Sequence, residues 1–214
     1  MKSGHLIVMS RAPRYGMGKR RLAAEVGDLA AWRFHRQTTA LLLRRLSGPP
    51  HGLVSWRCWL ALTPDSCLRR PRGLWPAPGW RLLPQGRGDL GQKMARLLSR
   101  LPPGPVVLVG SDIPDLGRAH ITAAFKALAR APWDHTPWVL GPALDEGYWL
   151  IGCRRRTHFR LPEKAALSWA SCQQLAALLQ QQEGRAVEFL PPLRDVDHKA
   201  DLVAVRLGKQ RLAR

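Results

Sequence analysis

The sequence predicts an α/β fold with a largely parallel central sheet flanked by helices. Apolar runs alternate along the chain with longer stretches of helical period, as expected when crossover helices join parallel strands. One of these runs, Pro105–Val109, is typical of a central strand buried on both faces. The 214 residues suit a single domain, since one core grows to about 250 residues before chains divide. We expect this domain to span residues 1–214, with a core over about 5–205 and a basic C-terminal tail.

Local signals set the individual elements. Glycine and proline in Ser47-Gly48-Pro49-Pro50 end one helix, Asp89 is placed to cap another, and Pro102-Pro103-Gly104 ends it. The proline-rich stretch between residues 63 and 79 predicts a loop. The expected strands are 5–9, 53–62, 80–83, 105–109, 138–140, 148–152 and 186–190. The expected helices are 28–46, 89–101, 118–131 and 163–182.

The composition excludes several classes of protein. Hydrophobic residues make up 45% of the chain and charged residues 23%, close to globular averages, so disorder is not expected. No stretch reaches the roughly 20 apolar residues of a membrane span, and polar residues follow the first strand too soon for a signal peptide. The four cysteines lack metal-ligand spacing. We therefore expect a cytoplasmic protein with reduced thiols and no membrane partner.

A net charge of +19 is the most unusual property of the chain. A nucleic-acid module would gather its charge on one face or interleave it with aromatic residues. Here the arginine clusters lie in different expected elements, so dedicated nucleic-acid binding is not favoured. A basic field also concentrates small anions such as nucleotides. The charge is compatible with either partner.

Ligands of open α/β sheets bind beyond the carboxyl ends of the strands, which makes the loop after the first strand a candidate site. Gly16 and Gly18 would let backbone N–H groups approach phosphate oxygens, and Lys19 and Arg21 would supply positive charge. Arg11 is a further candidate for the same contact. The loop matches neither the P-loop nor the GxGxxG pattern, and a turn with solvated basic residues is the alternative interpretation.

Asp112 directly follows the buried strand at 105–109. A carboxylate at that strand tip is placed to hold Mg²⁺ or Mn²⁺, which prefer oxygen ligands and bridge to substrate phosphates. Capping of the next helix is the alternative, and it fits Asp115 better. We expect a functional Asp112 and a structural or supporting Asp115.

Two later segments carry further carboxylates. Asp145 and Glu146 fall in a turn between two expected strands, where a plain acidic turn is almost as good an explanation as a site. Asp195 and Asp197 follow the last expected strand, and a period of two places them on one side of an extended segment. A second metal ligand could come from there. A helix cap and a surface carboxylate are the alternative.

Taken together, five segments resemble the bacterial DUF2064 family, which is glycosyltransferase-like and related to nucleotidyltransferases of the molybdenum-cofactor and phospholactate-guanylyltransferase kind. The resemblance covers roughly residues 5–202. The matching segments are Pro13-x-x-Gly16-x-x-Lys19-x-Arg21-Leu22, Gly88-Asp89-Leu90-Gly91-x-x-Met94, Gly110-Ser111-Asp112-x-Pro114-Asp115-Leu116, Gly141-Pro142-Ala143-x-Asp145-x-Gly147-Tyr148 and Leu193-Arg194-Asp195-Val196-Asp197.

The resemblance implies a GT-A-like fold that binds a nucleotide with Mg²⁺ or Mn²⁺. It implies that Asp112 is a metal ligand, with Asp197 at the second metal position. We further expect Lys19 to act with Asp112 in catalysis, and Asp89 and Asp145 to bind the nucleotide. Expected partners are a nucleotide or nucleotide-sugar donor and a small-molecule acceptor.

Three departures separate this chain from the family pattern. Lys19-Arg20-Arg21 stands for Lys-Thr-Arg, which removes a hydroxyl that faces phosphate. Asp145-Glu146-Gly147 stands for Asp-Gly-Gly, which puts a bulky anion where glycine would let a substrate approach. His198-Lys199-Ala200-Asp201 stands for Thr-Pro-Glu-Asp, which removes the proline at the helix start but keeps Asp201.

The expected function is metal-dependent transfer from a nucleotide-activated substrate, with glycosyl transfer from a nucleotide-sugar favoured. Nucleotidyl transfer with release of pyrophosphate is the first alternative. The second is a nucleotide-binding or regulatory protein without turnover, which Arg20 and Glu146 suggest and which an intact Asp112 and Asp197 argue against.

Overall fold

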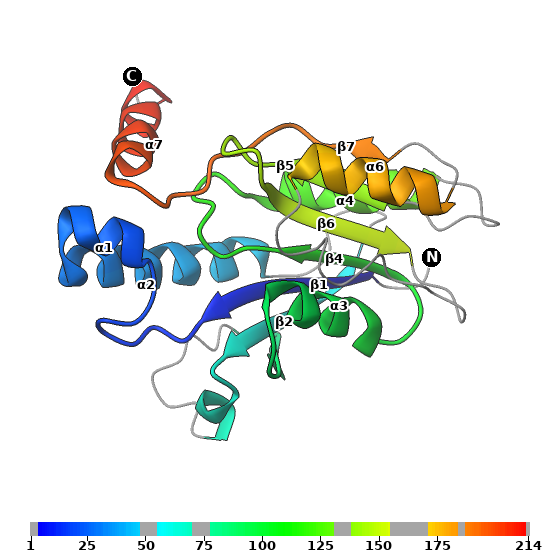
Figure 1. Ribbon diagram of the computed structural model, residues 1–214, viewed down its shortest axis with the longest axis horizontal. Helices are drawn as coiled ribbons and strands as arrows, with labels where there is room; N and C mark the ends of the chain where they lie inside the picture. The colour runs from blue at the N-terminus through cyan, green and yellow to red at the C-terminus, as the bar shows by residue number, and fades with distance from the viewer. Residues whose placement is uncertain are drawn as a thin grey trace.

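The computed structural model describes residues 4–47, 55–69, 78–130, 138–154, 171–183 and 187–212, and it contains a seven-stranded sheet covered by helices on both faces (Figure 1). The strands are β1 (Gly4–Arg11), β2 (Trp56–Thr63), β3 (Trp80–Pro84), β4 (Pro105–Val109), β5 (Trp138–Pro142), β6 (Tyr148–Arg154) and β7 (Glu188–Phe189). The helices are α1 (Arg20–Val26), α2 (Asp28–Leu46), the 3₁₀ turn η1 (Asp65–Arg69), α3 (Leu90–Arg100), α4 (Arg118–Arg130), α6 (Cys172–Glu183) and α7 (Lys199–Leu212).

The sheet is mostly parallel, as the sequence predicts. Its strand order is β3-β2-β1-β4-β6-β5-β7, and β6 pairs antiparallel with both β4 and β5 while the other pairings are parallel. The arrows of β1 and β2 in Figure 1 point toward α1 and α7. The carboxyl ends of the parallel strands therefore face these two helices, at the edge where α/β sheets bind ligands.

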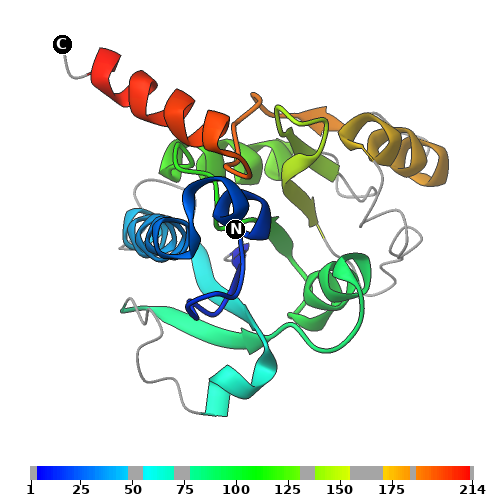
Figure 2. The ribbon, with the colours of Figure 1, turned by 60° about the vertical axis from the view of Figure 1, so that its left-hand side comes forward.

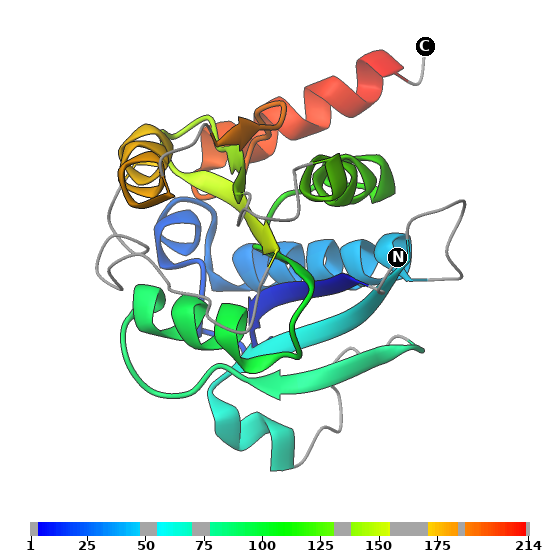
Figure 3. The same ribbon diagram turned by 90° about the vertical axis from the view of Figure 1, so that its right-hand side faces the viewer.

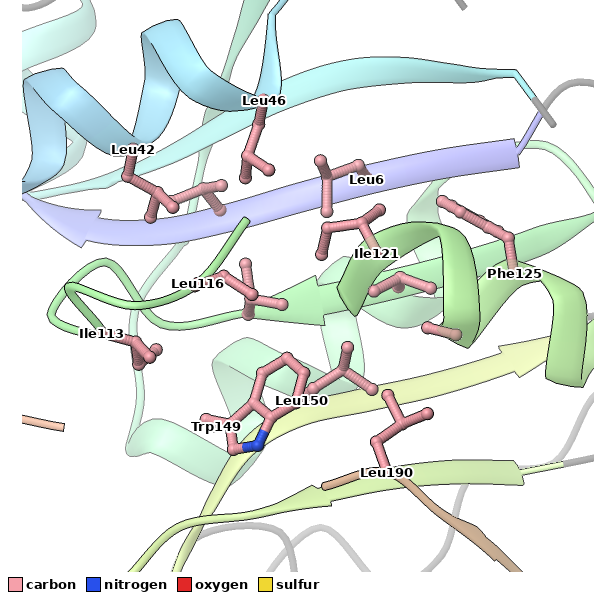
Figure 4. Packing of buried hydrophobic residues seen from close by; sticks show 14 of the residues in the cluster. Leu6, Leu42, Leu46, Ile113, Leu116, Ile121, Phe125, Trp149, Leu150 and Leu190 are labelled. Carbon is pink, nitrogen blue, oxygen red and sulfur yellow. The ribbon is translucent and has the colours of Figure 1, made fainter. Parts of the chain in front are cut away.

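Alternate residues of β1 serve two separate layers of core. Leu6 and Val8 belong to the cluster with α2 and α4, whereas Ile7 belongs to the cluster with α3 and α6. Figure 3 shows these helix pairs on opposite sides of the sheet, and Figure 4 shows Leu46 and Ile121 meeting Leu6. Each fully buried leucine or isoleucine contributes about 1.5–3 kcal/mol, so the two layers fix the sheet firmly.

A third, smaller cluster lies beyond the carboxyl edge. Leu22 of α1 packs there with Ala31 of α2, Val196 before α7 and Val205 within it. Figures 1 and 2 both show α7 next to α1, and the two helices are in contact. This cluster joins two segments from opposite ends of the chain beside the strand tips.

Most predicted elements are confirmed, and the helix 28–46 and the strand 105–109 have the predicted bounds. The interval before residue 28 was predicted as a loop, but it contains α1, which Gly27 separates from α2 by a φ of 82°. The C-terminal tail likewise contains α7. The predicted strand 186–190 is reduced to Glu188–Phe189.

The predicted helix 163–182 is present from Cys172 to Glu183, and its first part lies outside the described residues. The predicted strand 53–62 begins at Trp56, and the residues before 55 likewise lie outside the description. Within the described ranges, no helix combines the length and the apolar character needed to cross a membrane.

Candidate active site

A cleft of about 1270 Å³ opens at the carboxyl edge of the sheet. Its wall includes Ser10 at the end of β1, Ser111 after β4, Tyr148 at the start of β6 and the segment that follows β7. The loop between β1 and α1 forms one side. The candidate residues of all four sequence segments thus contribute to one cavity, with a single exception given below.

Lys19 lies between the two aspartates that the sequence assigns to a metal. Its Nζ is 2.5 Å from Asp112 Oδ2 and 2.7 Å from Asp197 Oδ1. The Lys19 side chain is only 8% exposed, whereas those of Asp112 and Asp197 are 31% and 36% exposed. Lys19 was predicted to contact phosphate, but here its ammonium neutralises the carboxylate pair. Its contact with the phosphates of a nucleotide-activated substrate stays a prediction.

Local structure explains how these three side chains meet. Asp112 lies three residues after the end of β4, and its backbone oxygen accepts a hydrogen bond from Val196 N–H at 3.2 Å. That bond ties the tip of β4 to the segment carrying Asp197. Lys19 is the N-cap residue of α1 and has a φ of 47°, so its backbone lies in the left-handed region. This turn directs the chain out of the loop and into α1.

The electrostatics of the cluster follow from burial and charge. Burial alone would lower the pKa of Lys19, but the carboxylates of Asp112 and Asp197 outweigh it and raise the pKa above its ordinary value. Burial, together with the nearby charges of Asp145 and Asp112, raises the pKa of Asp195 to about 6. Carboxylates are therefore concentrated here around the Lys19 ammonium.

The carboxylate pair fits a divalent cation of the Mg²⁺ type. Two carboxylates from different segments already converge on one positively charged atom. Mg²⁺ is usually held by one or two carboxylates together with substrate phosphates rather than by a cage of protein ligands. The described residues contain no group of three or more His, Cys, Asp or Glu side chains placed to hold a metal ion. Asp112 and Asp197 would hold the ion.

The basic side of the cleft comes from the loop after β1 and the first turn of α1. Arg11, Gly18, Arg20 and Arg21 all line the cleft, and the three arginines are exposed. Arg21 Nη1 is also 3.4 Å from Asp197 Oδ2. Gly16 is the exception among the candidates, since it does not line the cleft and sits in the exposed tip of the loop with a φ of 70°.

Asp89 and Asp145 line the same cleft in different settings. Asp89 caps α3 as predicted, because its Oδ1 accepts the Gln92 N–H at 2.7 Å in a capping box. Asp145 is exposed, and its Oδ1 accepts the Gly147 N–H at 3.0 Å within the turn between β5 and β6. Each therefore has a structural task in addition to its place in the cleft lining.

Asp115 does not cap the helix that follows it. It is exposed and makes no hydrogen bond among the described residues, whereas Gly117 N–H donates to His120 Nδ1 at 3.1 Å just before α4. The predicted capping role of Asp115 is therefore wrong. The ring of His120 accepts the amide hydrogen bond at the start of α4 instead.

Sequence reasoning missed two buried polar residues of the cleft wall. Gln85 is 4% exposed, and its Nε2 donates to the backbone oxygens of Ser10 and Ala61, which ties the end of β3 to β1 and β2. His35 is 8% exposed and lies 3.0 Å from the Arg11 backbone oxygen, and burial lowers its pKa. His35 carried a weak signal, as a histidine in line with the apolar face of α2.

Comparison with known proteins places the fold. A candidate nucleotide-diphospho-sugar transferase from Desulfovibrio desulfuricans G20 is 24% identical, covers 96% of this chain and 87% of its own, and has a TM-score of 0.76. The 4-diphosphocytidyl-2C-methyl-D-erythritol synthase of Anaerococcus prevotii DSM 20548 is 11% identical, with coverages of 98% and 96% and a TM-score of 0.58. A CMP:2-keto-3-deoxy-manno-octonic acid synthetase complexed with CTP is 10% identical, with coverages of 98% and 99% and a TM-score of 0.53.

No curated protein matches the sequence. A family model does match it over residues 52–169, more than half of the chain, and its description is "uncharacterized protein conserved in bacteria" (DUF2064). Asp89, Asp112 and Asp145 lie inside the matched range, whereas Lys19 and Asp197 lie outside it. The chain belongs to the DUF2064 family and has the α/β fold of the nucleotide-diphospho-sugar transferases.

Proposed function

We propose that this protein is a transferase that depends on a divalent metal and uses a nucleotide-activated donor, with glycosyl transfer from a nucleotide-sugar as its reaction. The observation that carries this proposal is the convergence of Asp112 and Asp197 on the Lys19 ammonium inside the cleft. Carboxylates at strand tips beside a basic loop form the combination that binds a metal and a diphosphate together. The fold of the Desulfovibrio desulfuricans protein, which bears the name of such a transferase, supports the same reaction.

The side chains of this cleft have complementary tasks in such a reaction. Asp112 and Asp197 would hold the cation, which withdraws charge from the leaving phosphates. Arg11 and Arg21 would orient the diphosphate and oppose the negative charge that develops on it. Lys19 would supply positive charge to the carboxylates and to the phosphates of a donor bound beside them. This mechanism requires positioning and electrostatics but no covalent nucleophile.

Nucleotidyl transfer is the second candidate, and one observation favours it. Arg11, Lys19, Arg20 and Arg21 line one side of the cleft, and Lys93 of α3 lines another part. Positive charge at two separate parts of the lining would suit the longer anion of a triphosphate. A neighbour of the same fold was solved with CTP.

The decisive experiment separates these reactions by their products. Purified protein is incubated with Mn²⁺ and either nucleotide-sugars or nucleoside triphosphates, together with pooled small-molecule acceptors. Released nucleoside diphosphate indicates glycosyl transfer, and released pyrophosphate indicates nucleotidyl transfer. Asp112→Ala should abolish either product, whereas the matched control Asp115→Ala removes an exposed carboxylate three residues away and should leave product formation unchanged.

Three other results would overturn part of the proposal. Donor turnover that ignores both Mn²⁺ and Asp112→Ala would refute the metal site. Metal-dependent nucleotide binding by calorimetry without any product would favour the binding protein without turnover. Absence of nucleotide binding altogether would refute the proposed function.

A further inference from the structure

The segment carrying Asp197 is fixed by the first turn of α7. Asp201 Oδ2 accepts the backbone N–H of Asp197 at 3.2 Å and that of His198 at 3.0 Å. Asp201 Oδ1 accepts a hydrogen bond from Arg194 Nη1 at 3.0 Å. The Asp201 carboxylate therefore binds the backbone N–H groups of two successive residues, Asp197 and His198. It also binds the side chain of Arg194, which precedes them in the chain.

The residue at the N-cap position of α7 does not cap the helix with its own side chain. His198 occupies the N-cap position, where Ser, Thr, Asp or Asn would accept an amide hydrogen bond from the first turn. Its ring Nδ1 instead lies 2.6 Å from Glu25 Oε1, and Glu25 Oε2 accepts the Lys199 N–H at 2.8 Å. Glu25, on α1, thus supplies to α7 the acceptor that its own N-cap residue does not.

Helix α1 consequently grips the Asp197 segment at two points. Lys19 at the start of α1 contacts the Asp197 carboxylate, and Glu25 near its end binds the two residues after Asp197. Between these points, Leu22 packs against Val196 in the small apolar cluster. The position of the Asp197 segment therefore depends on Glu25 and Leu22, which do not line the cleft, as well as on Lys19, which does.

We propose that Asp201 and Glu25 are positioning residues that hold Asp197 in place as a metal ligand. Neither of them lines the cleft, so each acts through the backbone around Asp197. Partners that orient a metal ligand typically change metal affinity by about 10–100-fold when removed. The inference rests on the proposed function, because it assigns a metal to Asp112 and Asp197.

The test measures Mn²⁺ binding to the full chain by electron paramagnetic resonance of free Mn²⁺, without nucleotide. Asp201→Ala should weaken binding by about 10–100-fold, and Glu25→Ala by about 10-fold. Glu25→Gln should bind more tightly than Glu25→Ala, because a glutamine oxygen still accepts the Lys199 N–H. Asp115→Ala is the control for loss of a carboxylate near the site and should bind as wild type does.

Glu25 is an exposed surface residue, so its variants keep the test valid even if Asp201→Ala does not fold. One outcome would overturn the positioning role and leave the proposed function intact. In it, both Glu25 variants and Asp201→Ala bind Mn²⁺ with wild-type affinity, whereas Asp112→Ala loses Mn²⁺ binding. If Asp115→Ala weakens Mn²⁺ binding as much as the other variants do, the loss of negative charge alone explains the weakening. That result would also overturn the positioning role. Undiminished binding by Asp112→Ala would refute the metal site and the proposed function.

Discussion

Lys19 and Glu146 share an unusual backbone but differ in what their side chains do. Both have a left-handed backbone without being glycine, with φ values of 47° and 72°, and both line the cleft. The Lys19 side chain is nearly buried between two carboxylates. The Glu146 side chain is exposed, and its carboxylate accepts no hydrogen bond from the described residues.

The difference between the two side chains indicates two separate origins of backbone strain. A left-handed conformation costs a residue with a side chain about 1–2 kcal/mol, and it persists at functional sites because surrounding contacts require it. Contacts of that kind hold Lys19. The Glu146 side chain has no such contact among the described residues, although its backbone oxygen accepts the Cys172 N–H at 2.8 Å, and the resemblance noted in the sequence implies glycine at this position. We infer that the strain at Lys19 serves the site, whereas the strain at Glu146 accompanies a substitution.

The largest expected effect follows from removing the partner of Lys19. Asp112→Asn keeps the side-chain shape but removes the charge that binds both Lys19 and a cation. We expect turnover to fall by about 10²–10³-fold, the range found when one electrostatic contact to a transition state is removed. Product formation at saturating donor and Mn²⁺ measures it, with Glu146→Gln as the control for charge. A loss of turnover below threefold would contradict the functional role that the comparison with Glu146 assigns to Lys19 and its partner Asp112.

Replacing Lys19 itself tests whether its strain is useful. Lys19→Gly removes the strain and both ion pairs, and Lys19→Met removes the ion pairs alone. Both should lose about 10²-fold in turnover, and Lys19→Gly should unfold no later than wild type in urea. The glycine variant should exceed the methionine variant in unfolding free energy by about 1 kcal/mol. A Lys19→Gly variant that is more stable than wild type and fully active would contradict the functional reading of this strain.

A smaller effect of opposite sign is expected at Glu146. Glu146→Gly should raise the free energy of unfolding by about 0.5–1 kcal/mol, because relief of the left-handed strain exceeds the entropy cost of glycine. Glu146→Ala is the matched control, since it removes the same charge but keeps a side chain at positive φ. Urea denaturation of the three proteins gives the values. Equal stability of the alanine and glycine variants would mean that the backbone at Glu146 is unstrained.

The smallest expected effect concerns pH. The pKa of Lys19 is raised above its ordinary value of 10.5, so its ion pairs stabilise the fold fully below pH 10.5, and this stabilisation disappears as the pH rises through the folded-state pKa. The difference in unfolding free energy between wild type and Lys19→Met should therefore stay constant from about pH 7 to pH 9. A difference that decreases across this interval would show that Lys19 titrates earlier and is not held by both aspartates.

Local sequence signals determined much of the fold. Strand β4 and helix α2 were predicted with their observed bounds, because an apolar run and a helical period closed by stop signals are properties of neighbouring residues. The sequence also placed Asp112 at the tip of a buried strand. It did not predict α1 or α7, since helices of 7 and 14 residues are marginal alone and depend on tertiary packing. Their packing against Val196 requires contacts between the two ends of the chain.

By itself, then, the sequence determined the fold class, the buried strand that precedes Asp112 and the set of charged residues that follow the strands. Only the tertiary structure decided that Lys19 meets Asp112 and Asp197, which lie 93 and 178 positions away along the chain. It also decided that Glu25 caps a helix other than its own. The physical reason is that hydrophobic period reports which face of an element is buried, whereas strand order and long-range packing decide which side chains come within bonding distance.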